Sequence, residues 1–279
     1  MIPFDFQYSK PQSIEEAVRQ YYENRSSGKK PSYFSGLTEL ITLGRLNLVY
    51  TDAVIDLKGV EGYQGMGEDG QYLIFGGGAA LTAIAESNLF PLLAKTSSEI
   101  ADRTSRNKIT LAGNICGQFF YREAVLPLLL SDCLLGIAGT EGLVYHPIHH
   151  VFEQEIRLKE GEFLFSILVE KKYRDLPYVS IKRRKQWDTG YPLVTAAALL
   201  KEGEIRMAFS GVCPFPFRSR EMEMMLNDRA LTAAERAERA LAYLPQPVLD
   251  DVEGSKEYRL FVLRNTITDC IQQLEGERQ

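Results

Sequence analysis

Hydrophobic positions near the N-terminus follow the spacing of an amphipathic helix. They recur at intervals of three and four residues, which places them on one helical face: Ile14, Ala17, Val18 and Tyr21. Ser13 precedes this face and Glu16 follows three residues later, the pattern of a capping box. The spacing predicts a helix from about residue 14 to about Asn24, and the polar residues 25–31 then predict a connector.

Short β-rich stretches bounded by turns predict a sheet region after this connector. Residues 33–45 are typical of a short strand, a glycine turn and a helix that begins near Thr38. The β-rich stretches that follow are 53–60, 61–67 and 71–77. The clearest hairpin turn is at 68–70, and residues 80–106 are mainly helical with a break at Pro91.

The second half of the chain changes character. An apolar helix at 122–132 leads into a hairpin that turns at 139–142. The strand-like runs that follow are 162–170, 177–185, 192–200 and 205–212, and the helical runs start at Arg218, Thr232 and Ser255. Three or four antiparallel strands followed by about three helices predict a compact α+β unit. We therefore expect two domains, 1–172 and 173–279.

Composition and charge exclude several classes of protein. The chain has 279 residues, 45% of them hydrophobic, which is enough for a sizeable core and typical of two domains. The formal net charge of −5 and the pI of about 5.5 argue against binding to nucleic acid or to an anionic membrane. No apolar run is long enough to span a membrane, and residues 1–13 lack the features of a signal peptide, so we expect a cytoplasmic protein.

The cysteines and histidines predict no metal centre in this chain. The four cysteines are far apart and form no C-x-x-C motif: Cys116, Cys133, Cys213 and Cys270. His146, His149 and His150 have no carboxylate or thiol at ligand spacing, and Pro147 predicts a loop there. Any metal chemistry must therefore come from another protein.

Two glycine-containing turns stand out as candidate binding segments. Residues 105–117, SRNKITLAGNICG, and residues 33–40, YFSGLTEL, each place Ser or Thr hydroxyls beside a glycine. Glycine allows close backbone approach, and consecutive backbone N–H groups in such turns form concavities that bind anions. Either segment alone is also typical of an ordinary β-turn. Together they could converge on one pyrophosphate without a basic side chain.

Six segments, in order along nearly the whole chain, resemble the FAD-binding medium subunit of the molybdenum hydroxylases, the xanthine dehydrogenase and carbon monoxide dehydrogenase group. They are FDFQYSKPQSIEEAV, YFSGLTELI, FGGGAALTAIAE, RNKITLAGNI, SGVCPFPFRSREME and EYRLFVLRN. The most specific is RNKITLAGN, which is similar to R-N-x-x-T-I-G-G-N. The resemblance implies an N-terminal FAD-binding domain of the PCMH type, like that of vanillyl-alcohol oxidase, in two α/β subdomains. A C-terminal domain with a small antiparallel sheet and about three helices would follow.

The resemblance also implies a set of FAD contacts. The residues it assigns to the cofactor are Phe34, Ser35, Gly36, Leu37, Thr38, Glu39, Leu40, Thr110, Ala112, Gly113, Asn114, Glu123, Leu164 and Lys182. The first seven would cradle the pyrophosphate, and 110–114 would form a second wall. Glu123 would accept hydrogen bonds from cofactor hydroxyls, Leu164 would touch the flavin and Lys182 would be a charge partner. Each of the last three also has an ordinary interpretation, as a helix carboxylate, a core residue and a solvated strand edge.

Two positions depart from the family pattern. Leu37 stands where many members have a second glycine, and Phe120 where many have proline. If Leu37 needs a positive φ, it is strained, and the first loop must be arranged differently or the site is weakened. Residues 76–81 also suggest G-x-G-x-x-G, but Leu81 occupies the third glycine position, so we interpret them as a strand-to-helix turn.

The implied function is electron transfer by an oxidoreductase subunit that has no catalytic acid or base of its own. FAD would pass electrons from a partner's iron–sulfur clusters to NAD+ or another acceptor, since the cofactor carries the redox chemistry. The implied partners are a molybdenum-cofactor large subunit and a two-iron two-sulfur small subunit in a heteromeric complex. Two alternatives stay open: a free-standing flavin oxidase, and a non-enzymatic scaffold that has lost FAD.

Overall fold

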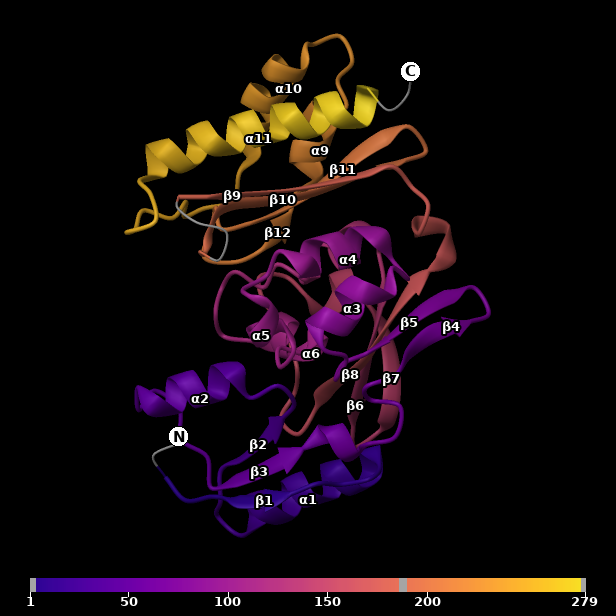
Figure 1. Cartoon of the computed structure of the whole chain (residues 1–279), viewed down its shortest axis with the longest axis vertical. Coiled ribbons are helices and arrows are strands. Elements are labelled where there is room, and N and C mark those ends of the chain that lie inside the picture. The colour runs from indigo at the N-terminus through magenta and orange to yellow at the C-terminus, as the bar shows by residue number, and fades with distance from the viewer. Residues whose placement is uncertain (1–3, 186–189, 277–279) are drawn as a thin grey trace.

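A parallel three-stranded sheet forms one end of the molecule (Figure 1). The computed structural model describes residues 4–185 and 190–276. The elements of this N-terminal layer are β1 (Gln7–Ser9), α1 (Ile14–Ser26), β2 (Pro31–Phe34), α2 (Thr38–Arg45) and β3 (Ala53–Asp56). The strand order is β1-β3-β2, and α1 buries Ala17 and Val18 as its apolar spacing predicts.

The predicted capping box of α1 is only half formed. Ser13 Oγ accepts a hydrogen bond from Glu16 N at 3.1 Å, as expected. The Glu16 carboxylate, however, accepts from Gln12 N at 2.7 Å, one residue before the N-cap. The complete capping box lies at Thr232 and Glu235, at the start of a later helix.

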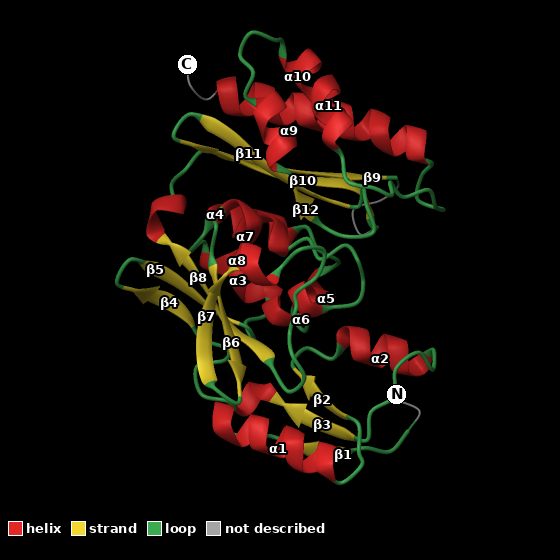
Figure 2. Cartoon of the chain, turned by 180° about the vertical axis from the view of Figure 1, so that it is seen from behind, coloured by secondary structure: helices red, strands yellow, loops and turns green. Residues whose placement is uncertain are grey.

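A five-stranded antiparallel sheet and short helices form the middle layer. Its strands are β4 (Met66–Asp69), β5 (Tyr72–Gly76), β6 (Leu134–Gly139), β7 (Gly142–Pro147) and β8 (Phe163–Glu170), in the order β4-β5-β8-β6-β7. Its helices are α3 (Leu81–Ser87), α4 (Pro91–Ser98), α5 (Arg103–Arg106), α6 (Leu111–Cys116), α7 (Val125–Leu130) and α8 (Ile148–Val151). Figure 2 shows these helices beside the sheet, on the side that faces the C-terminal strands. The predicted hairpin at 68–70 and the helix break before Pro91 are confirmed.

The C-terminal layer is a four-stranded antiparallel sheet with helices on its outer face (Figure 1). Its elements are β9 (Tyr178–Arg184), β10 (Pro192–Lys201), β11 (Glu204–Ser210), β12 (Phe217–Arg218), α9 (Arg220–Leu226), α10 (Ala233–Ala240) and α11 (Lys256–Gly276). Strand β10 is apolar on both faces. Ala197 and Leu199 pack into the middle layer, whereas Ala196 and Ala198 pack under the outer helices. The unbroken hydrophobic run of β10 follows from this two-sided burial.

Some local predictions are wrong. The helix expected from Arg218 begins at Arg220, because Arg218 pairs with Ala208 in the short strand β12 and Ser219 caps the helix. The loop expected around Pro147 contains the one-turn helix α8, and Pro147 sits at its N-cap, where the missing N–H costs nothing. Residues 61–65 form turns rather than a strand. The α+β class is confirmed.

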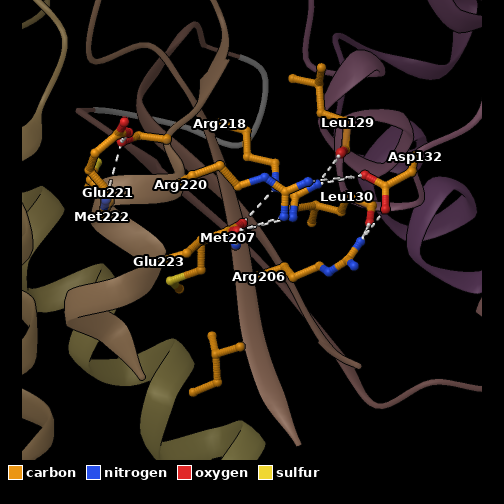
Figure 3. A network of polar contacts seen from close by, with 12 residues as sticks. Leu129, Leu130, Asp132, Arg206, Met207, Arg218, Arg220, Glu221, Met222 and Glu223 are labelled. Atoms are coloured by element: carbon orange, nitrogen blue, oxygen red, sulfur yellow. Dashed lines mark hydrogen bonds and ion pairs between the residues drawn. The ribbon is translucent and has the colours of Figure 1, made fainter. Parts of the chain in front are cut away.

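A network of ion pairs, partly buried, joins the middle and C-terminal layers (Figure 3). Asp132, which follows α7, accepts hydrogen bonds from Arg206 on β11 at 2.6 Å and from Arg218 on β12 at 2.9 Å. Arg218 also pairs with Glu223 on α9 at 2.6 Å. The two arginines donate further bonds to the carbonyl groups of Leu130 and Leu129, each at 2.8 Å. Three elements of the C-terminal layer are thereby tied to the end of α7.

Candidate functional site

Three neighbouring cavities lie between the N-terminal layer, the middle layer and β9. The first, of about 490 Å³, is lined by residues 34–40 together with Thr110 and Gly113. The second, of about 520 Å³, is lined by Thr38, Glu39, Gly113, Asn114, Glu123 and Lys182 among others. The third, of about 170 Å³, is lined by Phe34, Ser35, Ala112, Gly113 and Leu164 among others. All fourteen sequence-predicted residues therefore line this cavity system, and Gly113 lines every part of it.

The loop before α2 is built around two unusual residues. Leu37 has φ 59° and ψ −5°, so it adopts the left-handed conformation that a glycine would favour. Gly36 cannot carry a side chain, because a Cβ there would lie 2.1 Å from the Lys108 carbonyl oxygen. The two predicted segments thus touch each other directly at Gly36. The strain that the sequence suggested at Leu37 is present.

The start of α2 has N–H groups without a side-chain cap. Leu37 is the N-cap residue and has no oxygen with which to accept a hydrogen bond from the first turn. Thr38, Glu39 and Leu40 make up that first turn, and all three line the first cavity. Backbone N–H groups at a helix start, together with the helix dipole, attract an anion. This end of α2 therefore offers donors to a phosphate.

Helix α6 forms the opposite wall of the first cavity. Thr110 is its N-cap, and the Thr110 hydroxyl accepts from Gly113 N at 3.2 Å. Ala112 N donates to Gly77 O at 2.8 Å, which fixes the helix against the turn that follows β5. Asn114 Oδ1 accepts from Ala124 N at 3.1 Å and holds the loop after α6. Thr110 and Asn114 therefore position the wall, and among the described residues only Gly113 lines all three cavities.

Glu39 ties the start of α2 to the loop after α6. Its Oε1 accepts hydrogen bonds from Gln118 N and, at 3.1 Å, from Phe119 N. A carboxylate in the first turn of a helix is favoured by the helix dipole. Glu39 therefore braces the two segments against each other along the edge shared by the first and second cavities.

Glu123 and Lys182 pair with each other rather than standing as separate contacts. Lys182 Nζ donates to Glu123 Oε2 at 2.8 Å and to Glu99 O at 3.0 Å. Thr195 Oγ1 donates to Glu123 Oε1 at 2.6 Å. The two charged side chains are only 2% and 5% exposed. The pair joins the loop before α7 to strands β9 and β10 at the wall of the second cavity, so Lys182 is not a solvated strand edge.

Leu164, Phe34 and Ser35 line the third and smallest of these cavities. Leu164 is buried at the start of β8, and its carbonyl lies where a Cβ on Gly77 would clash, at 2.6 Å. Lys58 Nζ lies 3.8 Å from the centre of the Phe34 ring and donates to Ser35 O at 2.9 Å. The third cavity thus has apolar walls, and behind them lies Lys58, which is paired with Asp56 at 2.7 Å.

Sequence reasoning missed a second group of residues at the second cavity. Arg122 lines it with its side chain 7% exposed, and the rings of Tyr121 and Tyr191 stack at 4.5 Å with 10° between their planes. Tyr191 comes from the segment before β10. A polar Arg-Glu pair before an apolar helix is usually a solvated helix start, so the sequence alone carries no signal that Arg122 is buried.

The other motifs belong to the scaffold. The three glycines 76–78 use their N–H groups within the protein, donating to the carbonyl groups of Gly65, Phe165 and Tyr63. Their N–H groups are therefore not available to bind a phosphate as those of a Rossmann turn are. This agrees with the interpretation of residues 76–81 as a strand-to-helix turn. His149 and His150 pack edge to face on α8. Among the residues that the structure describes, no helix is long and apolar enough to cross a membrane.

The cavity system fits a dinucleotide cofactor such as FAD. It offers uncapped N–H groups at the start of α2, a glycine wall at Gly113 and apolar walls at Leu164 and Phe34. Extended ligands of mixed polarity bind in such elongated clefts, where a few placed donors fix the orientation. Glu160, on the rim of the first cavity, is paired with Arg25 at 2.6 Å and is not a free negative charge.

Comparison with known proteins identifies the family. Residues 4–170 match the family described as FAD binding domain in molybdopterin dehydrogenase, and residues 178–274 match the CO dehydrogenase flavoprotein C-terminal domain. The carbon monoxide dehydrogenase medium chain of Hydrogenophaga pseudoflava is 24% identical over 271 residues, which cover 93% of each chain.

Solved structures share the whole fold. Carbon monoxide dehydrogenase from Hydrogenophaga pseudoflava aligns with a TM-score of 0.87 at 22% identity, over 99% of each chain. Quinoline 2-oxidoreductase from Pseudomonas putida 86 aligns with a TM-score of 0.86 at 21% identity, also over 99% of each chain. The two family matches span most of the sequence. The chain therefore belongs to the FAD-binding medium subunits of the molybdenum hydroxylases, the oxidoreductase family that includes carbon monoxide dehydrogenase.

Proposed function

We propose that this subunit passes electrons from iron–sulfur clusters of a partner, through its FAD, to NAD+ or another acceptor. Its partners would be a molybdenum-cofactor large subunit and a two-iron two-sulfur small subunit, as the carbon monoxide dehydrogenase likeness suggests. In this proposal the hydroxylase is xanthine dehydrogenase-like. The observation that carries the proposal is the convergence of fourteen family-implied residues on one system of three cavities.

We assign the roles of the site residues from their contacts. The N–H groups at the start of α2 would hold the FAD diphosphate, Gly113 would leave room for it because it has no side chain, and Leu164 would lie against the flavin. Glu123 would accept hydrogen bonds from cofactor hydroxyls through the lone pairs that Thr195 and Lys182 leave open. Lys182 would act on the cofactor through this carboxylate.

The protein itself supplies binding and orientation. Bound FAD would supply the redox chemistry, exchanging electrons with an iron–sulfur cluster and hydride with NAD+. Leu164 and Phe34 give the third cavity apolar walls, and the buried Glu123–Lys182 pair keeps β9 against the loop before α7. We also propose that the domains divide near residue 172, between β8 and β9.

One spectroscopic experiment tests the cofactor, and one anaerobic experiment tests the role. The purified chain should show flavin bands near 370 and 450 nm (roughly, for the free cofactor), and guanidinium should release intact FAD.

Purines and aldehydes should not bleach the flavin of the chain alone under anaerobic conditions. They should bleach it once both partner subunits are added, if the complex accepts such substrates. Colour that stays with the denatured chain, or rapid bleaching of the chain alone, would instead support a free-standing flavin oxidase.

The electron acceptor is tested by the reverse reaction. Hydride exchange at a flavin is reversible, so NADH should reduce the bound flavin and a dye should reoxidise it if NAD+ is the natural acceptor. No reduction by NADH, in the complete complex as well as in the chain alone, would exclude NAD+ as the acceptor while leaving electron transfer from the clusters intact.

A further inference from the structure

Arg122 is a buried cation to which the resemblance to the family assigns no contact with FAD. It lies in the loop between α6 and α7, lines the second cavity, and has a side chain only 7% exposed. Its φ of 32° lies in the left-handed region, which a residue with a Cβ rarely adopts. A strained backbone that holds a charged side chain in a cavity is typical of a functional position.

The protein satisfies the Arg122 guanidinium only in part. One terminal nitrogen donates to the Gln154 carbonyl at 3.0 Å. In the described part of the chain, Nε has no hydrogen-bond partner. The nearest acidic side chain in that part is Glu155, at 4.0 Å, and Glu155 is 76% exposed. Such a distant, solvated carboxylate neutralises a buried cation poorly.

Other buried arginines of this chain are paired much more closely. Arg218 contacts Glu223 at 2.6 Å and Asp132 at 2.9 Å, and Arg236 contacts Glu275 at 2.8 Å through a two-pronged pair. Arg259 pairs with Asp251. A buried guanidinium normally needs such a partner, because desolvation of the charge is costly. Arg122 lacks such a closely paired carboxylate, and its side chain borders the second cavity.

The position of Arg122 points to the diphosphate rather than to the rest of the dinucleotide. The loop that ends at Arg122 is held by Glu39, in the first turn of α2, through Gln118 N and Phe119 N. The charge of Glu39 also acts on the Arg122 guanidinium. The second cavity joins Arg122 to Thr38 and Gly113, the two walls assigned above to the diphosphate. An arginine fork matches phosphate oxygens in geometry and charge.

We propose that Arg122 is the cationic partner of the FAD diphosphate, donating from its unpartnered edge into the second cavity. This proposal rests on the proposed function of the three cavities. It adds a charged side chain to a phosphate site that the sequence describes with main-chain donors alone. Arg122 is a binding residue in this proposal and takes no part in the redox chemistry.

The test compares FAD affinity in three full-length proteins: the parent, R122M and R184M. Arg184 is the matched control, because one terminal nitrogen donates to a carbonyl, that of Glu99, its Nε has no partner, and it lines none of the three cavities. FAD is removed and titrated back, with flavin fluorescence as the readout. R122M should weaken FAD binding by about 10- to 100-fold, the range for a hydrogen bond to a charged group, and R184M should match the parent. The midpoint potential of bound FAD should stay that of the parent.

Several outcomes overturn the proposal. Equal FAD affinity in R122M and the parent would show that Arg122 does not contact the cofactor. A loss of affinity accompanied by a changed midpoint potential would place Arg122 at the flavin ring instead. If R122M does not fold, R122K replaces it, with R184K as its control. Lysine keeps the charge but not the fork, so several-fold weaker binding supports the proposal and parent affinity overturns it. A parent protein that binds no FAD would contradict the proposed function as well.

Discussion

Two polar sites join the middle layer to the C-terminal sheet, and they differ in how fully they are satisfied. At one, Asp132 accepts from Arg206 and Arg218 at 2.6 and 2.9 Å and from the Tyr173 hydroxyl at 3.1 Å (Figure 3). At the other, Glu123 and Lys182 pair at 2.8 Å, but Arg122 beside them has no carboxylate within 3.5 Å in the described chain. Similar residue types thus form two different contacts between the layers. The Asp132 network, in which every charged group is paired, is called the closed joint, and the Glu123–Lys182 pair with the incompletely paired Arg122 is called the open site.

The difference assigns a structural role to the Asp132 network and leaves hydrogen-bonding capacity for a ligand at the Glu123 site. Asp132, Arg206 and Arg218 line none of the three cavities and bond to one another, so their contribution is to hold the layers together. The Glu123 site borders about 520 Å³ of cavity and keeps unused hydrogen-bonding capacity at Arg122. Buried polar groups are costly unless satisfied, so the unpartnered edge of Arg122 at the cavity fits the proposal that this arginine contacts a bound molecule.

The largest expected effect comes from breaking the buried pair at the open site. Glu123→Gln should lower the free energy of unfolding by about 3–5 kcal/mol, because Lys182 is 2% exposed and would lose its counterion. Urea unfolding followed by circular dichroism measures this. Adding Lys182→Met to the same chain should recover part of the loss, since no buried charge remains. A double variant no more stable than E123Q would contradict this account of the pair.

Breaking the closed joint should cost less. Asp132→Ala removes a carboxylate that is 33% exposed, and Arg218 keeps Glu223 as a partner. We expect a loss of about 2 kcal/mol in the free energy of unfolding, below the range for a fully buried pair. FAD affinity should not change, because Asp132 lines none of the three cavities.

A surface pair provides the control for this joint. Asp269→Ala breaks the contact with Arg183 at 2.6 Å, in which both side chains are 40% exposed or more. Exposed pairs contribute about 0–1 kcal/mol. If D132A and D269A have the same free energy of unfolding, the Asp132 network does not hold the layers together.

Much of the fold could be predicted from the sequence because its signals are local. The apolar spacing of 14–21, the proline at Pro91 and the glycine turn at 68–70 each act within a few residues, and the structure has these features. The two candidate binding segments were also visible locally, through Gly36 and the Thr110 hydroxyl. Short-range sterics and capping determine such features wherever they occur.

The remaining features depend on contacts between distant residues. Glu123 and Lys182 are 59 positions apart, and nothing near either one shows that they pair. Arg122 is polar and precedes a helix, which in most proteins means an exposed side chain. Strand β12 has only two residues and forms because β11 lies beside it, so the sequence pattern predicted a helical run from Arg218 instead. Tertiary packing overrode local propensity in each case.

The Asp132 network should make the free energy of unfolding depend on pH. Burial favours a higher pKa for Asp132, but the hydrogen bond and charge of Arg206 and the charge of Arg218 hold the pKa below its usual value. A carboxyl group with a lowered pKa contributes stability above its unfolded pKa of about 4, and this is lost as pH falls through the folded pKa. The stability gap between the parent and Asp132→Asn should therefore be constant from pH 7 to about 5 and shrink below about pH 4. An unchanged gap at low pH would mean that Asp132 does not titrate there.

The smallest expected effect concerns the strain at Leu37 in the cavity loop. Leu37 has φ 59°, where a side chain costs about 1 kcal/mol and glycine costs little, so Leu37→Gly should raise the free energy of unfolding by about 0.5 kcal/mol after the loss of side-chain contacts. Leu46→Gly is the matched control, because Leu46 caps the other end of α2 with an ordinary φ of −88°. There the same change should cost about 0.5–1 kcal/mol, since glycine only adds freedom to the unfolded chain. Thermal unfolding of both variants gives the comparison, and equal destabilisation would mean that the left-handed turn at the start of α2 carries no strain.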